Sequence, residues 1–479
     1  MKARELLGTL LTPGTFRSWD EAPADVRPDP AYAAGLAAAR DRTGLDESVI
    51  TGEGVLAGRR VAVAASEFAF LGGSIGVAAG ERLARSIERA TAERLPLIAL
   101  PASGGTRMQE GTVAFLQMVK IAVAVTAHKA AHLPYVVYLR HPTSGGVLAS
   151  WASLGHLTLA EPGAFIGFLG PRVYQALHGA PFPGGVQTAE NLHAHGLVDA
   201  VVSPADLAGC LSRLLTALTA EPRPVPQQET AADPAGRGGG PAWEFIQHTR
   251  EPGYPAAGEL IRVVATDVLP LHETGTMLAL ARIGGYPCVL AAQDRHGPPP
   301  GPAALRMTRR GIHLAAGLGL PLVTVIDTPG AELSPEAEQD GLAGEIAHCL
   351  ADLMALGTPT VSVLLGQGTG GAALALLPAD RILAAEHAWL APLAPEGASA
   401  IVFRDSGHGP DLAARQHVRA ADLAAAGIID QVIPEPPGDP GGLCRWLGHA
   451  VHGALAELIT QDTRTRLESR AGRFRHLGA

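Results

Sequence analysis

The feature that most constrains this chain of 479 residues is an internal repeat. The apolar stretch 95–100 (LPLIAL) returns as 320–325 (LPLVTV), at an offset of 225 residues. The same offset carries the glycine pair Gly145–Gly146 onto Gly370–Gly371. Because the offset stays the same from residue 95 to residue 146, the sequence predicts two homologous domains, each folded in the same order of elements.

The order of elements within each copy indicates α/β units. In the first copy, the apolar run 133–139 is typical of a buried strand, and 147–154 is expected to be a helix. The pair Gly145–Gly146 lies at the turn between them, where bare backbone allows a ligand to approach the N–H groups. The positive end of the helix dipole favours negative charge at the same place. Two such turns, one in each domain, suggest two ligands held face to face.

A segment of biased composition separates the copies. Residues 222–242 contain a run rich in Pro, Gln, Ala and Gly without an apolar period, which predicts a linker between domains 1–221 and 243–479. Charged residues come too soon after Met1 for a signal peptide, and no uninterrupted apolar stretch reaches about 18 residues. We therefore expect a cytoplasmic protein without a membrane segment.

Charge and cysteine content exclude several classes of function. The net charge is −9 and no basic block is present, so nucleic acid is not expected as a partner. The four cysteines are scattered without a Cys-x-x-Cys pair, which argues against a disulfide framework and against a zinc ribbon. The sequence therefore predicts no metal ligands.

Three other patterns have simpler explanations. Residues 72–76 match the G-x-S-x-G nucleophile elbow, but matches of this kind arise by chance in a chain with 58 glycines. Residues 366–371 match G-x-G-x-x-G, but the first copy retains only the final glycine pair of that motif. His193 and His195 could be metal ligands, and a surface pair at a helix end is the favoured alternative.

Several longer motifs resemble one family. The first half closely resembles the carboxyltransferase β subunit of bacterial acetyl-CoA carboxylase in three loops and one strand end: 68–76 (FAFLGGSIG), 102–111 (ASGGTRMQEG), 142–146 (PTSGG) and 167–172 (GFLGPR). The second half resembles the α subunit at 326–331 (IDTPGA), 366–374 (GQGTGGAAL) and 395–401 (PEGASAI). The resemblance covers most of 28–220 and 243–435, so the chain looks like fused β and α subunits. It implies an α/β architecture of tandem crotonase-like (ClpP/crotonase) domains.

The resemblance implies an activity. Enzymes of this family move CO2 from carboxybiotin to the α-carbon of acetyl-CoA or another short acyl-CoA. Negative charge develops on the thioester oxygen and on the biotin ureido oxygen, and removing one donor to such an oxygen costs about 10²–10³ in rate. By analogy, Gly145 and Gly146 are assigned to the thioester oxygen, and Gly370 and Gly371 to the ureido oxygen. Biotin itself can take the α-proton, so no protein base is required.

The resemblance also assigns residues around the two turns. The expected CoA site consists of Ser103, Gly104, Gly105, Arg107, Lys120 and Arg172. The last three are candidates for the CoA phosphates, with surface ion pairs as the alternative. The expected biotin side consists of Pro329, Gly330, Glu396 and Gly397.

Partners follow from the same resemblance. A biotin carboxylase and a biotin carboxyl carrier protein are expected as separate proteins, so biotin is attached to the carrier and not to this chain. The active site usually forms between two protomers, which implies a homodimer or a homohexamer. Two features depart from the family: the zinc ribbon that usually begins the β subunit is absent, so no zinc is expected, and the loop 297–302 is rich in proline.

Three other functions stay open. A malonyl-thioester decarboxylase on the same fold would use the first glycine turn and no biotin. A crotonase-type hydratase or isomerase would need carboxylates beside the turns, and these are not seen. A scaffold subunit without catalysis is the third; the intact glycine pairs argue against it, and the altered loop 297–302 keeps it open.

Overall fold

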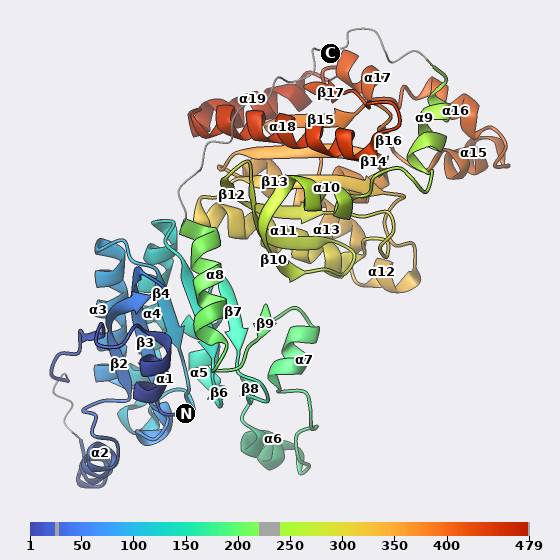
Figure 1. Cartoon of the computed structure of the whole chain (residues 1–479). Coiled ribbons are helices and arrows are strands. Elements are labelled where there is room, and N and C mark those ends of the chain that lie inside the picture. Colours follow the sequence, from blue (N-terminus) through green and yellow to red (C-terminus); the bar gives the residue numbers. More distant parts are fainter. Residues whose placement is uncertain (24–27, 220–239, 478–479) are drawn as a thin grey trace. The chain divides into compact units, whose positions relative to one another are not determined.

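The chain divides into two compact units. The computed structural model describes residues 1–23, 28–219 and 240–477 (Figure 1). The first unit spans Met1–Leu218 and the second spans Thr219–Ala479. Most of the expected linker 222–242 lies outside the described residues. Each unit is built around a sheet of its own, and the two are taken in turn below.

The first unit contains a sheet in the order β1-β2-β3-β4-β5-β7-β9. Its strands are β1 (Arg17–Ser18), β2 (Val49–Leu56), β3 (Arg59–Ser66), β4 (Leu97–Leu100), β5 (Tyr135–Leu139), β7 (Leu157–Ala160) and β9 (Ala200–Val201). Pairing is antiparallel from β1 to β3 and parallel from β3 to β9. A separate parallel pair joins β6 (Thr143–Ser144) to β8 (Ile166–Gly167).

Helices precede, connect and follow the strands. They are α1 (Ala3–Leu10), α2 (Pro30–Thr43), α3 (Val77–Ala92), α4 (Gly111–Ala130), α5 (Gly145–Leu148), α6 (Pro171–His178), α7 (Ala189–Ala194) and α8 (Leu207–Thr219), with short 3-10 turns η1 (Leu71–Gly73), η2 (Met108–Glu110) and η3 (Trp151–Ser153). The crossover helices α3 and α4 pack on one another. Leu83 and Ile87 of α3 and Ile121 of α4 are fully buried in one core with β4 and β5. Strands β4 and β5 are buried along their whole length, as expected for a parallel sheet covered on both faces.

The second unit repeats this plan, and its strands from β13 onward are longer than their counterparts in the first unit. Its sheet runs in the order β10-β11-β12-β13-β14-β15-β17, and β16 pairs with the end of β14. The strands are β10 (Ala265–His272), β11 (Met277–Ile283), β12 (Tyr286–Ala292), β13 (Leu322–Thr328), β14 (Thr360–Thr369), β15 (Arg381–Ala385), β16 (Trp389–Ala391) and β17 (Gln431–Ile433). Pairing is again antiparallel up to β12 and parallel beyond it.

The helices of the second unit include counterparts of those in the first. They are α9 (Ala242–Thr249), α10 (Ala257–Val264), α11 (Pro302–Leu318), α12 (Pro335–Gln339), α13 (Leu342–Ala355), α14 (Gly370–Leu374), α15 (Pro395–Phe403), α16 (Gly409–Arg415), α17 (Ala420–Ala425), α18 (Pro440–Ile459) and α19 (Thr463–Arg475). Helices α11 and α13 pack on one another as α3 and α4 do. Helix α11 begins with Pro302 in its first turn and ends at Gly319 in the left-handed conformation, which suits these two residue types.

The hairpin that opens each sheet shows the repeat at the level of the backbone. Strands β2 and β3 are joined by Ala57 and Gly58 with φ of 48° and 82°, and β11 and β12 by Gly284 and Gly285 with φ of 56° and 85°. Two successive positive φ values are the mark of a type I′ turn, whose twist matches that of the flanking strands. Both sheets therefore begin with the same turn.

One helical stretch, Met108–Ala130, is long and apolar enough to cross a membrane by length and composition alone. It comprises η2 and α4. Because one face of α4 packs on α3 and the sheet, the stretch has the position of a core helix, and core helices commonly pass the same test. The expectation of no membrane segment stays a prediction.

Candidate active site

Two glycine-rich loops of the first unit are joined by backbone hydrogen bonds. The N–H of Gly104, in the loop after β4, donates to the carbonyl of Gly72, in the loop after β3, at 2.9 Å. The N–H of Ile75 donates to the carbonyl of Gly105 at 2.9 Å. Because β3 and β4 are parallel neighbours, both loops leave the sheet at its carboxyl edge, where ligands bind in open α/β sheets. The expected CoA residues Gly104 and Gly105 therefore lie at that edge.

The turn after β5 packs against the same loop. A Cβ placed on Gly105 would lie 3.3 Å from the nitrogen of Gly146. One placed on Gly145 would lie 3.3 Å from the carbonyl oxygen of Gly104. The two backbones approach closely, and this approach explains glycine at positions 105 and 145.

The first glycine turn forms the start of a helix. Helix α5 begins at Gly145, whose φ is 59°. The first N–H groups of a helix, including that of Gly146, have no acceptor within the helix, and the dipole adds partial positive charge there. A Cβ on Gly146 would lie 3.1 Å from Thr106 Oγ1 and 3.5 Å from Met118 Cγ. Gly146 therefore offers an N–H donor in a closely packed corner.

Ser103 forms hydrogen bonds to residues on both sides of this contact. It is fully buried, and its Oγ accepts a hydrogen bond from the N–H of Gly105 at 3.0 Å. Its carbonyl accepts from the N–H of Ser144 at 2.9 Å. The second unit has the same arrangement at the repeat offset, because Thr328 Oγ1 accepts from the N–H of Gly330 at 3.2 Å. Ser103 thus holds the loop in place.

The second glycine turn is built in the same way. Helix α14 begins at Gly370, whose φ is 66°, directly after β14. A Cβ on Gly371 would lie 2.6 Å from Ile346 Cδ1 of α13. A Cβ on Gly330, in the loop after β13, would lie 3.7 Å from Thr369 Cγ2. The first N–H groups of α14 therefore lie, like those of α5, at the start of a helix in a closely packed environment.

The proline-rich loop 297–302 occupies the place of the glycine-rich loop of the first unit. The N–H of Glu332, after β13, donates to the carbonyl of Pro300 at 3.1 Å. At the repeat offset this bond corresponds to the one from the N–H of Arg107 to the carbonyl of Ile75, at 2.9 Å. The departure in composition therefore leaves the contact between the two neighbouring loops in place.

Arg107 lies in a buried network of polar side chains. It is 1% exposed, and its guanidinium donates to Glu47 Oε2 at 2.9 Å, to the hydroxyl of Tyr32 at 3.3 Å and to the carbonyl of Ser74 at 2.8 Å. Burial acts to lower the pKa of Arg107, but the hydrogen bonds to Glu47 and Tyr32 and the charge of Glu47 together outweigh it and raise that pKa. Burial, together with the hydrogen bond to Glu110, raises the pKa of Tyr32 to about 12. Arg107 thus ties α2 to two loops, and its contact with a CoA phosphate stays a prediction.

The other two phosphate candidates lie in helices. Lys120 of α4 is 42% exposed along its side chain, and its Nζ lies 2.6 Å from Glu81 Oε2. Arg172 lies in α6, and its side chain is outside the described part of the chain. Lys120 can exchange a surface ion pair for a phosphate at little cost, because exposed pairs contribute only about 0–1 kcal/mol.

The expected biotin-side residues lie after β13 and in α15. Pro329 is exposed at the end of β13, and Gly397 lies in the first turn of α15. Glu396 Oε1 lies 2.6 Å from Nη1 of Arg250, and the hydrogen bond from Arg250 lowers the pKa of Glu396. Arg250 follows α9 directly, so this ion pair fastens α15 to α9.

The histidine pair of the first unit does not face a common ligand. Nδ1 of His193 lies 3.0 Å from the carbonyl of Val198, and Nδ1 of His195 lies 2.8 Å from the carbonyl of Asn191. Each ring therefore bonds to a separate backbone group at the end of α7.

Each unit thus combines a largely parallel sheet with a helix that begins at a glycine pair, next to the loop that follows the neighbouring strand. This geometry is that of an α/β protein whose backbone N–H groups are placed to donate to a negatively charged oxygen. The family model described as the carboxyl transferase domain matches residues 3–435. The chain belongs to this family.

Curated relatives match over nearly the whole chain. The chain is 57% identical over 487 residues to the probable biotin-dependent acyl-coenzyme A carboxylase beta3 subunit of Mycobacterium tuberculosis, covering 99% of this chain and 98% of the relative. It is 38% identical over 512 residues to the acetyl-coenzyme A carboxylase carboxyl transferase subunits beta/alpha of Salinispora tropica, covering 99% and 90%. The resemblance found in the sequence motifs is confirmed.

Solved structures show the fold. Transcarboxylase 12S, crystallised with hydrolysed methylmalonyl-coenzyme A, matches with a TM-score of 0.78 at 21% identity, covering 96% of this chain and 90% of that chain. A single-chain, multi-domain long-chain acyl-CoA carboxylase matches with a TM-score of 0.71 at 21% identity, covering 93% of this chain and 45% of that one. The expected tandem crotonase-like fold is confirmed.

Proposed function

We propose that this protein is the carboxyltransferase component of a biotin-dependent acyl-CoA carboxylase. It transfers CO2 from carboxybiotin, carried on a partner protein, to the α-carbon of an acyl-CoA. The observation that carries the proposal is the pair of glycine turns, at Gly145–Gly146 and Gly370–Gly371, each at the start of a helix beside a packed loop. The names of the relatives support the same class of reaction.

The first turn suits the acyl-CoA. When the α-carbon loses its proton, negative charge moves onto the thioester oxygen. The N–H of Gly146 donates to that oxygen, and the dipole of α5 supports the charge. These donors are fixed before the reaction because Gly105 and Gly145 are packed against one another. The chain therefore does not reorganise when the charge forms.

The second turn suits the ureido group of biotin. The donor set fits, because N–H groups at the start of α14 match a ureido oxygen, which only accepts hydrogen bonds. Carboxybiotin would supply the CO2 and, once CO2 has left, an oxygen basic enough to take the α-proton. Gly370 and Gly371 hold that oxygen, and Pro329 and Gly330 line the approach from the loop after β13.

The substrate is proposed to be acetyl-CoA or another short acyl-CoA. This narrower choice is supported by the name of the Salinispora tropica relative, an acetyl-coenzyme A carboxylase carboxyl transferase. Lys120 is the candidate for a CoA phosphate, because its one described ion pair is exposed.

The proposed partners are a biotin carboxyl carrier protein and a biotin carboxylase, and the proposed assembly is a homohexamer or a homodimer. The solved transcarboxylase 12S is described as a hexamer assembly. In this chain α4 carries a row of exposed apolar side chains that a second copy would cover: Val113, Phe115, Leu116, Val119 and Val123.

The reverse reaction tests the proposal. Malonyl-CoA or methylmalonyl-CoA is given to the purified chain with a free biotin derivative, and release of the decarboxylated acyl-CoA is followed. We expect release that depends on biotin and falls in Gly146→Val and in Gly371→Val. The matched control is Gly209→Ala in α8, where a new Cβ would meet nothing within 4 Å.

Each other outcome contradicts part of the proposal. Release at the same rate without biotin would indicate a malonyl-thioester decarboxylase. Failure of both substrates, in a chain that binds acyl-CoA and folds normally, would refute catalysis on short acyl groups and favour the scaffold role.

A further inference from the structure

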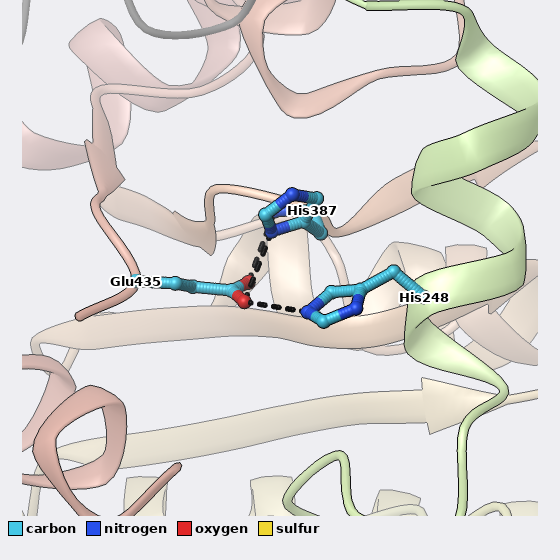
Figure 2. Close-up of side chains that lie close together, drawn as sticks. All are labelled: His248, His387 and Glu435. Carbon is cyan, nitrogen blue, oxygen red and sulfur yellow. Dashed lines mark hydrogen bonds and ion pairs between the residues drawn. The ribbon is translucent and has the colours of Figure 1, made fainter. Parts of the chain in front are cut away.

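Two histidines and a glutamate of the second unit converge on one point. His248 comes from α9, His387 from the turn between β15 and β16, and Glu435 from the segment after β17 (Figure 2). One ligand atom of each residue lies within 4.8 Å of the other two. No sequence motif predicts this cluster, because His248 and Glu435 are 187 residues apart.

The distances match those of a metal site. Glu435 Oε2 lies 2.9 Å from His387 Nδ1 and 3.2 Å from His248 Nε2. The two imidazole rings are 4.4 Å apart between centroids. In a tetrahedral zinc site each ligand atom lies about 2.0–2.2 Å from the ion, which places neighbouring ligand atoms about 3.3 Å apart. Glu435 Oε2 is near this spacing from both ring nitrogens, and all three ligand atoms lie within 4.8 Å of one another, so a rotation of the side chains would enclose an ion.

The surroundings orient these ligands as the second layer of a metal site does. Glu435 Oε1 accepts from the hydroxyl of Tyr254 at 2.9 Å and from the N–H of His387 at 3.1 Å, so Oε2 faces the two rings. The other ring nitrogen of His248, Nδ1, lies 3.3 Å from Glu251 Oε2. A carboxylate behind a ligating histidine and hydrogen bonds to a ligating carboxylate are the usual supports of metal ligands.

The position in the fold also suits a ligand. Strands β15 and β17 are parallel neighbours, so His387 and Glu435 follow their carboxyl ends at one edge of the sheet. In the first unit, Pro162 stands at the repeat offset from His387. The cluster is therefore particular to the second unit and is not a consequence of the repeat.

We propose that His248, His387 and Glu435 bind one divalent transition-metal ion, with Zn²⁺ as the best match. Two imidazoles and one carboxylate are a recurrent zinc ligand set, and the fourth position is left to water. This proposal departs from the expectation that the chain has no metal ligands, which rested on the scattered cysteines; this site uses none of them. The cluster lies apart from both glycine turns in sequence, so its test does not depend on the proposed carboxyl transfer.

The ion would fasten α9 to the sheet. Only His248 comes from α9, and the other two ligands come from the sheet edge. Arg250, directly after α9, holds Glu396 of α15. An ion at the cluster therefore stabilises the helix whose end positions α15, on the expected biotin side.

Metal binding to the full chain tests the proposal. The purified protein is freed of metal with a chelator and titrated with Zn²⁺ by calorimetry, and Co²⁺ is added in parallel to record the visible absorption of a low-symmetry site. We expect one ion per chain and a rise in melting temperature with Zn²⁺. Loss of a ligand in Glu435→Gln or His387→Ala should weaken binding by at least about 10–100-fold, since even outer supports contribute that much.

The controls separate this site from adventitious binding. His296→Ala removes an exposed histidine outside the cluster and should leave affinity and stoichiometry unchanged. His248→Gln, on α9, provides a ligand variant if changes at the sheet edge impair folding. If the wild type does not bind an ion stoichiometrically, or if the ligand variants bind it as tightly as the wild type does, the proposal is overturned and a metal-free His–Glu–His cluster is left.

Discussion

At the scale of single residues, the proposed chemistry depends on the glycine pairs, because their lack of a side chain leaves the backbone N–H groups open to a ligand. The glycine pairs were predicted from the repeat alone, and the structure places both at the start of helices. Their packing neighbours were not predictable, because Met118 and Ile346 approach from helices elsewhere in the sequence. The same applies to the buried network, since Glu47 lies 60 residues from Arg107.

The close contact between Gly371 and Ile346 gives a prediction that a second substitution should reverse. In Gly371→Ala the new Cβ meets Ile346 Cδ1 at 2.6 Å, so either the half-buried Ile346 side chain turns away or the start of α14 shifts. We expect biotin-dependent turnover to fall by up to about 10²-fold, the cost of displacing one oxyanion donor, to the extent that α14 and not Ile346 moves. Adding Ile346→Val removes the clashing atom and should restore most of the rate, measured in the reverse assay. A double variant as slow as the single one would contradict this explanation.

The buried network predicts a stability effect for Arg107. In Arg107→Met the carboxylate of Glu47 stays buried without its partner, which typically costs about 3–5 kcal/mol. Urea unfolding should show this loss, and Glu47→Gln combined with Arg107→Met should recover part of it. If Arg107 instead serves mainly as a phosphate ligand, its loss raises KM for the acyl-CoA and leaves the free energy of unfolding unchanged.

At the scale of elements, the predicted strand 133–139 corresponds to β5, but the predicted helix 147–154 is interrupted. Helix α5 ends at Leu148, and η3 follows at Trp151–Ser153. The hydroxyl of Ser150 donates to the carbonyl of Gly146 at 2.6 Å, and Trp151 is buried in the core. Local bonds of this kind compete with helix continuation, and apolar periodicity does not register them.

The packing of α4 on α3 predicts a pH dependence. His128 of α4 is buried, with Nδ1 2.9 Å from Thr91 Oγ1 of α3, and burial lowers its pKa. The unfolded chain therefore binds a proton that the folded chain resists, starting below about pH 6.5. The stabilising effect of neutral His128 is present above that pH and is lost as the pH falls toward the folded-state pKa.

The measurement is the free energy of unfolding as a function of pH. The wild type should lose stability as the pH falls from about 6.5 to the lower folded-state pKa of His128, by up to about 1.4 kcal/mol per pH unit for this one proton. His128→Gln should flatten this part of the curve, whereas His296→Gln, at an exposed position, should not. An unchanged slope in His128→Gln would assign the acid sensitivity to other groups.

At the scale of the whole molecule, the repeat was sufficient to predict two units of one fold, because an offset maintained through several motifs requires duplicated architecture. Assembly is less accessible from sequence. Apolar residues occur on more than one face of α4, and the sequence alone does not show which of these faces packs in the core. The structure assigns Ile121 and Val125 to the core and exposes Leu116, Val119 and Val123 on another face.

The exposed face of α4 gives the last prediction, that self-association depends on it. Contiguous apolar side chains on a surface usually mark an interface, and Val119 lies in the middle of this row at 60% exposure. Val119→Asp places a charge there without touching the core, so the subunits should separate while the fold is retained. Burying an unpaired charge at the centre of an interface typically costs more than about 2 kcal/mol, which raises the dissociation constant at least about 30-fold.

Light scattering after size exclusion should then show a lower mass for Val119→Asp with an unchanged circular dichroism spectrum. The matched control is Val263→Asp, at an exposed valine of α10 outside the row, which should keep the wild-type mass. If both variants keep that mass, α4 does not hold the subunits together, and the row is left as an exposed apolar surface.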